Sequence, residues 1–225
     1  MREQGVGGEE VTVSKGAANG NGNGNGYLAP VIKAINADLE QAEFFYVKFL
    51  QALGIWEIME DEPRQRTPAR VAHSYLEFFG DSLEPINFTT FPVPHCSVES
   101  CDVVSVYDIE FASLCAHHHL PFTGRCHIGY LPCEYVAGLS KLPRVVEHLT
   151  HGALIQEDVT RKIADYLFEA LACHGVVVVM EATHSCMALR GVRKPGHTAR
   201  TIATRGVFTT PEGETRLRLF MEGIR

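Results

Sequence analysis

The chain has 225 residues, of which 45% are hydrophobic, and its formal net charge is -7. This length is enough for one buried core with extensions. The acidic balance argues against a general nucleic-acid coat or a basic membrane-surface protein. The sequence shows no apolar run long enough to span a membrane and no signal-peptide segment. We therefore predict a cytoplasmic protein that binds neither nucleic acid nor a membrane, although a local cationic pocket could still hold a small polyanion.

The N-terminal part of the chain predicts a tail followed by two helices. Residues 1–26 contain the run GAANGNGNGNG, whose low apolar content predicts a disordered tail. Residues 27–53 carry apolar side chains at helical spacing, so we predict one amphipathic helix that ends at Gly54. Thr67 and Pro68 are typical of an N-cap and a first helical position, so a second helix is predicted to start there and to end at Gly80.

The rest of the chain combines strand and helix patterns. Strands are predicted over 103–111, 124–131, 176–182 and 198–208, and helices over 140–148, 156–173 and 211–224. Two helices, two strands, two helices, two strands and a last helix then follow one another. This order predicts an α+β fold in which a mainly antiparallel sheet packs on helices.

The seven cysteines are an odd number and are scattered through these patterns. A reduced protein with free or metal-bound thiols therefore fits better than a disulfide scaffold. Two of the cysteines lie in the site described next. The other five are predicted to be small buried hydrophobic residues without partners. They are Cys96, Cys101, Cys126, Cys133 and Cys173.

Two distant segments together offer the ligands of a zinc ion. Residues 113–122, SLCAHHHLPF, carry Cys115 and His118 three positions apart, and residues 183–190, THSCMALR, carry His184 and Cys186. Strand residues two apart point to the same face, so His184 and Cys186 can enter one cavity together. Two thiols and one imidazole suit a catalytic zinc that keeps one position open. Spacing alone equally allows a closed structural zinc with His184 or His117 as fourth ligand, or no metal.

Basic side chains cluster in two other places. Ser140, Lys141 and Arg144 lie at a predicted helix N-terminus, where backbone N–H groups and the helix dipole favour a phosphate. Taken alone, an ordinary N-cap with solvated basic residues is the better interpretation. Arg190 opens a second basic turn directly after Cys186, and two basic clusters near one metal site make a polyphosphate ligand more credible.

Several long segments resemble GTP cyclohydrolase I, in the family's order and at its spacings. They are SLCAHHHLPF, GYLP, GLSKLPRVVE, IQEDVTRKIAD, VVVMEATHSCMALRGVRKPG and TPARVAHSYLEFF, and the resemblance runs from about residue 27 to the C-terminus. It implies the tunnelling fold, a four-stranded antiparallel sheet with helices packed on one face, over residues 96–225. Residues 27–95 form an N-terminal helical region on this interpretation. The resemblance also implies a toroidal homodecamer of two pentamers, with active sites at subunit interfaces.

The reaction implied by the resemblance is the conversion of GTP and water to formate and 7,8-dihydroneopterin triphosphate, the first step of pterin (folate or biopterin) biosynthesis. Cys115, His118 and Cys186 would hold Zn²⁺, which activates a water to attack carbon 8 of the purine. His184 would protonate nitrogen 7, and His117 would carry or orient a proton. The triphosphate contacts implied are Ser140, Lys141, Arg144 and Arg190, with Arg66 as a further one, and the contacts to the pyrimidine half of guanine are Gln156 and Glu157.

The sequence departs from the family pattern at three places. Ala116 replaces the Glu that usually stands between the zinc Cys and the two His, and loss of such a supporting residue costs about 10–100-fold in affinity or activity. His119 replaces an apolar residue, and the segment HGAL before Gln156 lacks a usual Arg. Two alternatives follow. One is a related tunnelling-fold enzyme acting on a pterin or deazapurine, against which the intact basic set argues. The other is a non-catalytic nucleotide-binding paralogue, against which His117 and His184 argue.

Overall fold

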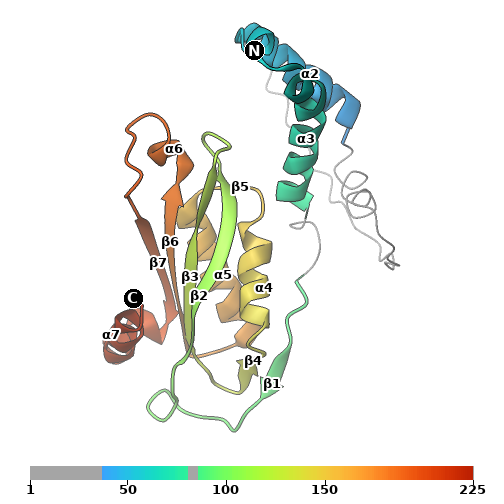
Figure 1. Cartoon of the computed structure of the whole chain (residues 1–225). Helices are drawn as coiled ribbons and strands as arrows, with labels where there is room; N and C mark the ends of the chain where they lie inside the picture. Colours follow the sequence, from blue (N-terminus) through green and yellow to red (C-terminus); the bar gives the residue numbers. More distant parts are fainter. Residues whose placement is uncertain (1–36, 81–85, 225) are drawn as a thin grey trace, which may run out of the picture.

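A computed structural model of the chain describes residues 37–80 and 86–224. Helices α2 and α3 form a pair that stands beside a larger body of sheet and helices (Figure 1). The predicted tail over residues 1–26, and the first part of the predicted helix over residues 27–53, lie outside the described residues. The predicted boundary between an N-terminal helical region and the sheet-containing region, at residues 95 and 96, stays a prediction.

The N-terminal pair consists of α2 (Leu39–Ala52), the short 3-10 helix η1 (Trp56–Ile58) and α3 (Asp61–Gly80). Asp38 caps α2 by accepting a hydrogen bond from the Gln41 amide at 2.9 Å. The predicted start of the second helix at Thr67 and Pro68 is wrong, because α3 begins six residues earlier and contains Pro68. Two acidic residues in its first turn suit the helix dipole, and Arg64 donates to the Met59 carbonyl at 2.7 Å, which anchors the earlier start.

A five-stranded sheet forms the centre of the larger body, with the order β5-β2-β3-β6-β7. The three pairings among the four long strands are all antiparallel, which confirms the prediction of an α+β fold with a mainly antiparallel sheet. They are β2 (Val104–Cys115), β3 (Pro121–Leu131), β6 (Gly175–His184) and β7 (Ala199–Gly206). The fifth strand, β5 (Ala153–Leu154), is parallel to the end of β2 and was not predicted, because two residues carry no readable pattern. A separate ribbon pairs β1 (Thr90–Pro92) with β4 (Tyr135–Ala137).

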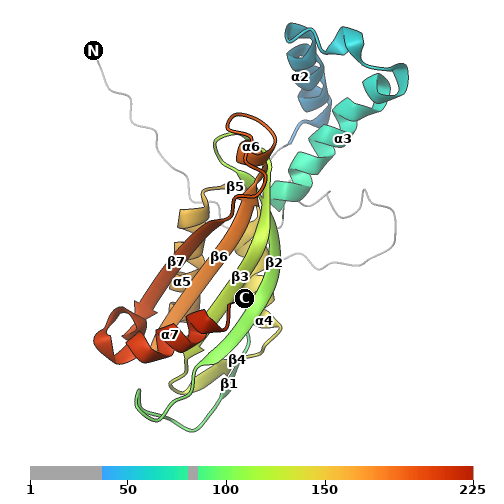
Figure 2. The same ribbon diagram turned by 60° about the vertical axis from the view of Figure 1, so that its left-hand side comes forward.

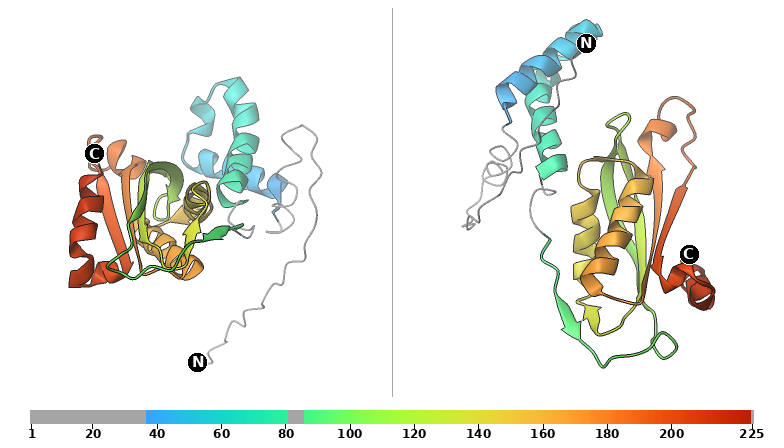
Figure 3. Two further views of the ribbon diagram at one scale, coloured as in Figure 1. Left: turned by 90° about the horizontal axis from the view of Figure 1, so that it is seen from below. Right: turned by 180° about the vertical axis from the view of Figure 1, so that it is seen from behind.

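Helices cover both faces of the sheet, not one face as expected. Helices α4 (Lys141–Thr150) and α5 (Gln156–Leu171) cover one face, and α7 (Glu214–Glu222) lies across the other (Figures 2 and 3). The valine run of β6 explains this correction. Val176 and Val178 face the core under α4 and α5, whereas Val177 and Val179 pack with Phe220 of α7. A strand that is apolar on both faces needs a cover on each. The remaining short helices are α6 (Ser185–Ala188), η3 (Val207–Thr209) and η4 (Pro211–Gly213).

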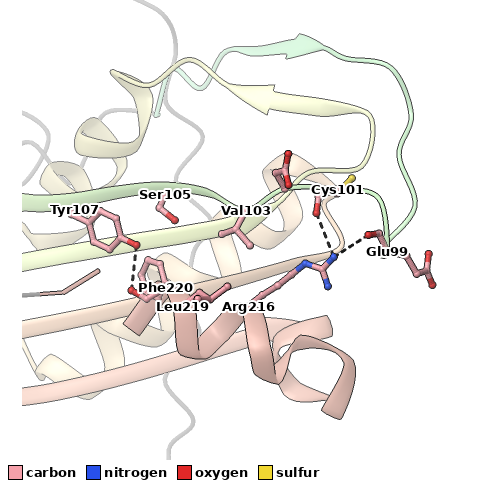
Figure 4. A pocket seen from close by; sticks show the side chains of 9 residues that line it. Glu99, Cys101, Val103, Ser105, Tyr107, Arg216, Leu219 and Phe220 are labelled. Atoms are coloured by element: carbon pink, nitrogen blue, oxygen red, sulfur yellow. Dashed lines mark hydrogen bonds between the residues drawn. The ribbon is translucent and has the colours of Figure 1, made fainter. Parts of the chain in front are cut away.

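A disulfide-closed loop supports α7 at one end of the sheet (Figure 4). Cys96 and Cys101 are bonded to each other, so the prediction that they have no partners is wrong for this pair. The prediction holds for Cys126 and Cys173, which are buried and free. Arg216 of α7 donates to backbone carbonyls of the loop, at 2.8 Å from that of Val98. A cavity of about 430 Å³ lies between the loop, the start of β2 and α7.

Among the described residues, no helix combines the length and apolar character that crossing a membrane requires. The predicted cytoplasmic location stays a prediction.

Candidate metal centre

The candidate centre lies where three chain segments meet at the opposite end of the sheet from the disulfide. Strand β2 ends at Cys115, a tight turn follows, and β3 starts at Pro121, so the segment SLCAHHHLPF does form a strand–strand connection. The His119 amide donates to the Cys115 carbonyl at 2.8 Å, and the Cys115 amide donates to the Leu120 carbonyl at 2.9 Å. Pairing of Phe122 with His184 brings the end of β6 to this turn.

Cys115, His118 and Cys186 form the group that could hold a metal, with ligand atoms all within 4.8 Å of one another. The two sulfur atoms lie 4.0 Å apart, and the Cys115 sulfur lies 3.9 Å from His118 Nδ1. Zinc–sulfur bonds of about 2.3 Å in a tetrahedral site place two sulfurs about 3.8 Å apart. The donor set and its spacing therefore fit zinc.

Cys186 reaches the group from α6, not from a strand. The spacing predicts His184 and Cys186 on one face of a strand, but β6 ends at His184 and the next four residues are helical. The helical turn changes the direction in which successive side chains point. Cys186 therefore faces Cys115, whereas His184 points to a different set of partners.

His184 lies beside the metal group and is held on three sides. Its Nε2 lies 2.8 Å from Gln156 Oε1, and its ring stacks on Phe122 with centroids 4.5 Å apart and planes 2° apart. Its backbone amide donates to His197 Nε2 at 3.3 Å. Burial, and then the neighbouring His197, lower the pKa of His184, while Glu157 partly opposes the shift. The neutral ring is thereby favoured.

The other two histidines of the turn differ in position. His117 is exposed, and its Nδ1 lies 3.8 Å from the Cys115 sulfur. His119 turns away to α3, where its ring lies 5.9 Å from that of Tyr75 and 6.4 Å from that of Phe79. His119 is therefore outside the metal group. His117 lies close to the Cys115 thiol but, unlike its neighbour His118, is not one of the three residues of the metal group.

Of the predicted phosphate contacts, Arg190 lies at the centre. Its Nη1 lies 3.3 Å from His118 Nε2, and it also donates to the Cys186 carbonyl at 3.5 Å. Glu157 is exposed in the first turn of α5, near His184. These two side chains could reach a ligand bound at the metal group.

The remaining predicted contacts lie elsewhere in the same chain. Ser140, Lys141 and Arg144 are at the start of α4, beside β4, whereas the end of α4 leads to β5 and the centre (Figures 1 and 2). A ten-residue helix is about 15 Å long, so Ser140 and Lys141 lie about that far along α4 from its end beside β5, and Arg144 lies about 9 Å from that end. Arg66 is on α3, with an ion pair to Glu62 at 3.4 Å. One chain alone does not bring both basic clusters to the centre.

Three contacts of His184 were not predicted from the sequence, namely those to Phe122, His197 and the side chain of Gln156. Phe122 is readable as a strand residue, but its stacking depends on the β3–β6 register. His197 follows a basic turn without any spacing signal. Gln156 was singled out, but for contact with a base.

A family model and several similar proteins point to the same family. The family model described as GTP cyclohydrolase I matches residues 44–224. A protein named GTP cyclohydrolase 1 from Rhodopirellula baltica is 42% identical over 182 residues, covering 78% of this chain and 75% of the relative. The protein of that name from Geobacillus kaustophilus is 42% identical over 180 residues, covering 76% and 93%, respectively. The one from Gloeobacter violaceus is 44% identical over 161 residues, covering 69% and 72%.

Among solved structures, an apo archaeosine synthase QueF-Like aligns with 46% of this chain and 93% of that chain, with a TM-score of 0.39 and 13% identity. This likeness is too low to bear on the fold. The family match covers both segments of the metal group, the helix that starts with Gln156 and the start of α4. The chain belongs to the GTP cyclohydrolase I family.

Proposed function

We propose that this chain is a zinc-dependent GTP cyclohydrolase I, which converts GTP and water to formate and 7,8-dihydroneopterin triphosphate. One observation carries the proposal. Cys115, His118 and Cys186 converge within 4.8 Å at the positions of the family motif, and His184 and His117 lie beside them without joining the group. Three ligands with free histidines nearby suit a catalytic zinc better than a closed structural one.

A zinc ion held by these three residues would supply a water activated for attack on carbon 8 of the purine, because zinc lowers the pKa of its bound water to about 7. His184 presents the other reactive group. Gln156 occupies its Nε2, which leaves Nδ1 to exchange a proton with nitrogen 7. The lowered pKa of His184 makes its protonated form a stronger acid. His117, exposed beside Cys115, carries or orients a proton in the later rearrangement.

On this proposal, the charged residues Glu157, Arg190 and Arg66 bind the substrate. Glu157 accepts from donor groups of the guanine edge, since it is exposed next to His184. Arg190 binds the triphosphate. A metal on Nδ1 of His118 would leave the proton on Nε2, which then cannot accept from Arg190. Metal binding would thus release this guanidinium toward a phosphate. Arg66 is a further phosphate contact on this proposal.

The position of the α4 cluster supports an oligomer. We propose the tunnelling fold and a toroidal homodecamer, in which Ser140, Lys141 and Arg144 of the partner subunit complete the triphosphate site. Within the described residues, β7 pairs only with β6, and β2 pairs outward only at its last two residues. Both sheet edges therefore keep backbone groups that a second copy can pair. Exposed aromatic side chains on α2 add apolar surface, at Phe44, Phe45 and Phe49.

Ala116 favours a second candidate, a non-catalytic nucleotide-binding paralogue. Its backbone amide donates to the Leu154 carbonyl at 3.0 Å, but its methyl group cannot replace the carboxylate that the family usually carries. A pterin or deazapurine enzyme is less favoured, because such substrates need no triphosphate contacts.

The test incubates zinc-loaded protein with GTP and measures formate and pterin absorbance together, with chelator-treated protein as control. Equal amounts of formate and dihydroneopterin triphosphate, lost on chelation and restored by zinc, support the proposal. Formate without a pterin would mean that rearrangement fails. GTP binding without either product would favour the paralogue.

A further inference from the structure

We infer that Gln156 is a positioning residue, which holds the imidazole of His184 in one orientation and one tautomer, and that it does not bind the base. The inference rests on the proposed function for its catalytic meaning. Its structural content concerns only Gln156 and His184 and can be tested without turnover.

The hydrogen bonds of Gln156 fix which way its amide points. Its Nε2 lies 3.1 Å from the carbonyl oxygens of both Met180 and Ala199, on β6 and β7. Carbonyl oxygens only accept, so the amide nitrogen must face them. The amide oxygen then faces His184 Nε2 at 2.8 Å. In the reversed amide, the oxygen would face two carbonyl oxygens, which cannot donate to it.

This orientation dictates the proton position on His184. An amide oxygen cannot donate, so His184 Nε2 must carry the hydrogen in this contact. In the neutral ring, Nδ1 is then the unprotonated nitrogen. Phe122 stacks on the ring at 4.5 Å and opposes its rotation. The His184 ring is therefore fixed in both plane and tautomer before any substrate arrives.

Gln156 itself is buried away from any substrate. The residue is only 3% exposed, and its amide nitrogen also lies 3.2 Å from Thr201 Oγ1. The Thr160 hydroxyl donates to the Gln156 carbonyl at 2.7 Å, which secures the start of α5. Turning the side chain toward a base would break its bonds to Met180, Ala199 and His184 together. The neighbouring Glu157, which is exposed, is the residue of the pair that is free to contact the base.

A purely structural clamp between α5 and the sheet is the competing explanation. It accounts for the bonds to Met180 and Ala199, but it needs no particular tautomer at His184. The proton position on His184 therefore separates the two explanations.

The first measurement uses the zinc-loaded protein with ¹⁵N-labelled histidine and records two-bond nitrogen–proton NMR spectra of the imidazoles. The His184 signals are assigned by their loss in His184→Gln. We expect His184 to carry its proton on Nε2. A proton on Nδ1 in the unmodified protein would overturn the inference without the need for any further variant.

The second measurement compares Gln156→Met, which keeps the length of the side chain and removes both polar groups, with Thr201→Val. The latter removes one partner of the amide nitrogen and the 2.7 Å contact to the Thr160 hydroxyl, but leaves the contact of Gln156 with His184. We expect Gln156→Met to give mixed tautomers and to lower kcat about 10–100-fold, the range found when the partner that orients a metal-bound histidine is lost. We expect the KM for GTP to change less than kcat. Thr201→Val should keep the Nε2–H tautomer.

Three results would refute the positioning role: a retained tautomer in Gln156→Met, a mixed tautomer in Thr201→Val alone, or a raised KM with unchanged kcat. The last would mean that the amide reads the base. Should the unmodified protein lack turnover, the proposed function fails, while the tautomers of the parent and the two variants still decide the inference.

Discussion

The two ends of the central sheet use cysteine pairs in opposite ways. At one end, Cys115 and Cys186 come from segments 71 positions apart, stay unbonded with sulfurs 4.0 Å apart, and share their surroundings with His118. At the other end, Cys96 and Cys101 are separated by five positions and bonded to each other. The first pair can accept a metal between its sulfurs, whereas the second has already formed its bond.

The surroundings explain the difference. The unbonded pair lies between a strand end and a short helix, where two imidazole rings lie close to the Cys115 sulfur and the Arg190 guanidinium contacts one of them. The bonded pair closes a loop whose carbonyls accept from Arg216, and the Cys96 carbonyl lies 2.8 Å from His174 Nε2. One pair is framed by groups that can bind and react, and the other by groups that fix a loop. The presence of a cysteine pair alone therefore does not show whether the pair binds a metal or stabilises the fold.

The largest expected effect is loss of the metal. Cys186→Ala removes one of three protein ligands, and we expect zinc to be lost and formate release to fall at least about 1,000-fold, since a metal contributes several kcal/mol to such barriers. Zinc content and formate release measure this directly. Cys173→Ala, which removes a buried free thiol elsewhere, is the matched control and should keep both. Full turnover in a zinc-free Cys186→Ala protein would contradict the comparison.

A smaller effect is expected at the other end. Replacing both Cys96 and Cys101 by Ser opens a six-residue loop and should lower the free energy of unfolding by about 2 kcal/mol. Denaturant unfolding measures the change, and zinc content should stay the same. Cys133→Ser, at a free thiol beside the loop, is the control. An unchanged unfolding midpoint in the double variant would show that the disulfide does not stabilise the fold. Loss of zinc would show that the two ends of the sheet are not independent.

The sheet between the two ends carries a pH-sensitive group. His127 is only 1% exposed; burial lowers its pKa, although Asp108 and Glu181 oppose the shift. A histidine whose pKa is lower in the folded state contributes stability above its unfolded pKa, about 6.5, and this stability is lost as the pH falls. The free energy of unfolding should therefore decrease from pH 7 to pH 5, and less so in His127→Gln. Equal pH slopes in the two proteins would show that His127 plays no part.

The smallest effect is expected at His119. Its ring contacts Tyr75 and Phe79 and not the thiols, so His119→Leu should leave zinc content unchanged and change the free energy of unfolding by less than about 1 kcal/mol. Metal analysis and thermal unfolding are sufficient to measure this. The corresponding change at His118 should remove zinc. Zinc loss in His119→Leu would show that this histidine belongs to the metal site.

Local patterns predicted the elements that one segment can specify by itself. The apolar stripe of α5 gave a start at Gln156, where the structure has it, and the valine run gave β6. The start of α3 was missed, because Pro68 looks like a first helical position although the acidic turn before it is already helical. The valine run of β6 already calls for cover on both faces, but which helix supplies the second cover depends on long-range packing that no local pattern contains.

The same limit applies to the site. Cys115, His118 and Cys186 were found from spacing and family resemblance, and the structure brings them together. The contact of Gln156 with His184 could not be predicted, because it depends on how the start of α5 meets β6 and β7. The Cys96–Cys101 bond depends in the same way on a loop whose conformation its sequence does not reveal.

The central claim is that the thiols at one end of the sheet hold an open, catalytic zinc. Zinc X-ray absorption on the zinc-loaded protein tests it most directly. We expect two sulfur ligands at about 2.3 Å, one imidazole nitrogen and one further light atom from water at about 2.0–2.1 Å. A first shell of two sulfurs and two imidazoles without water would instead make His117 or His184 a fourth ligand. Such a closed, structural site would contradict the proposed chemistry.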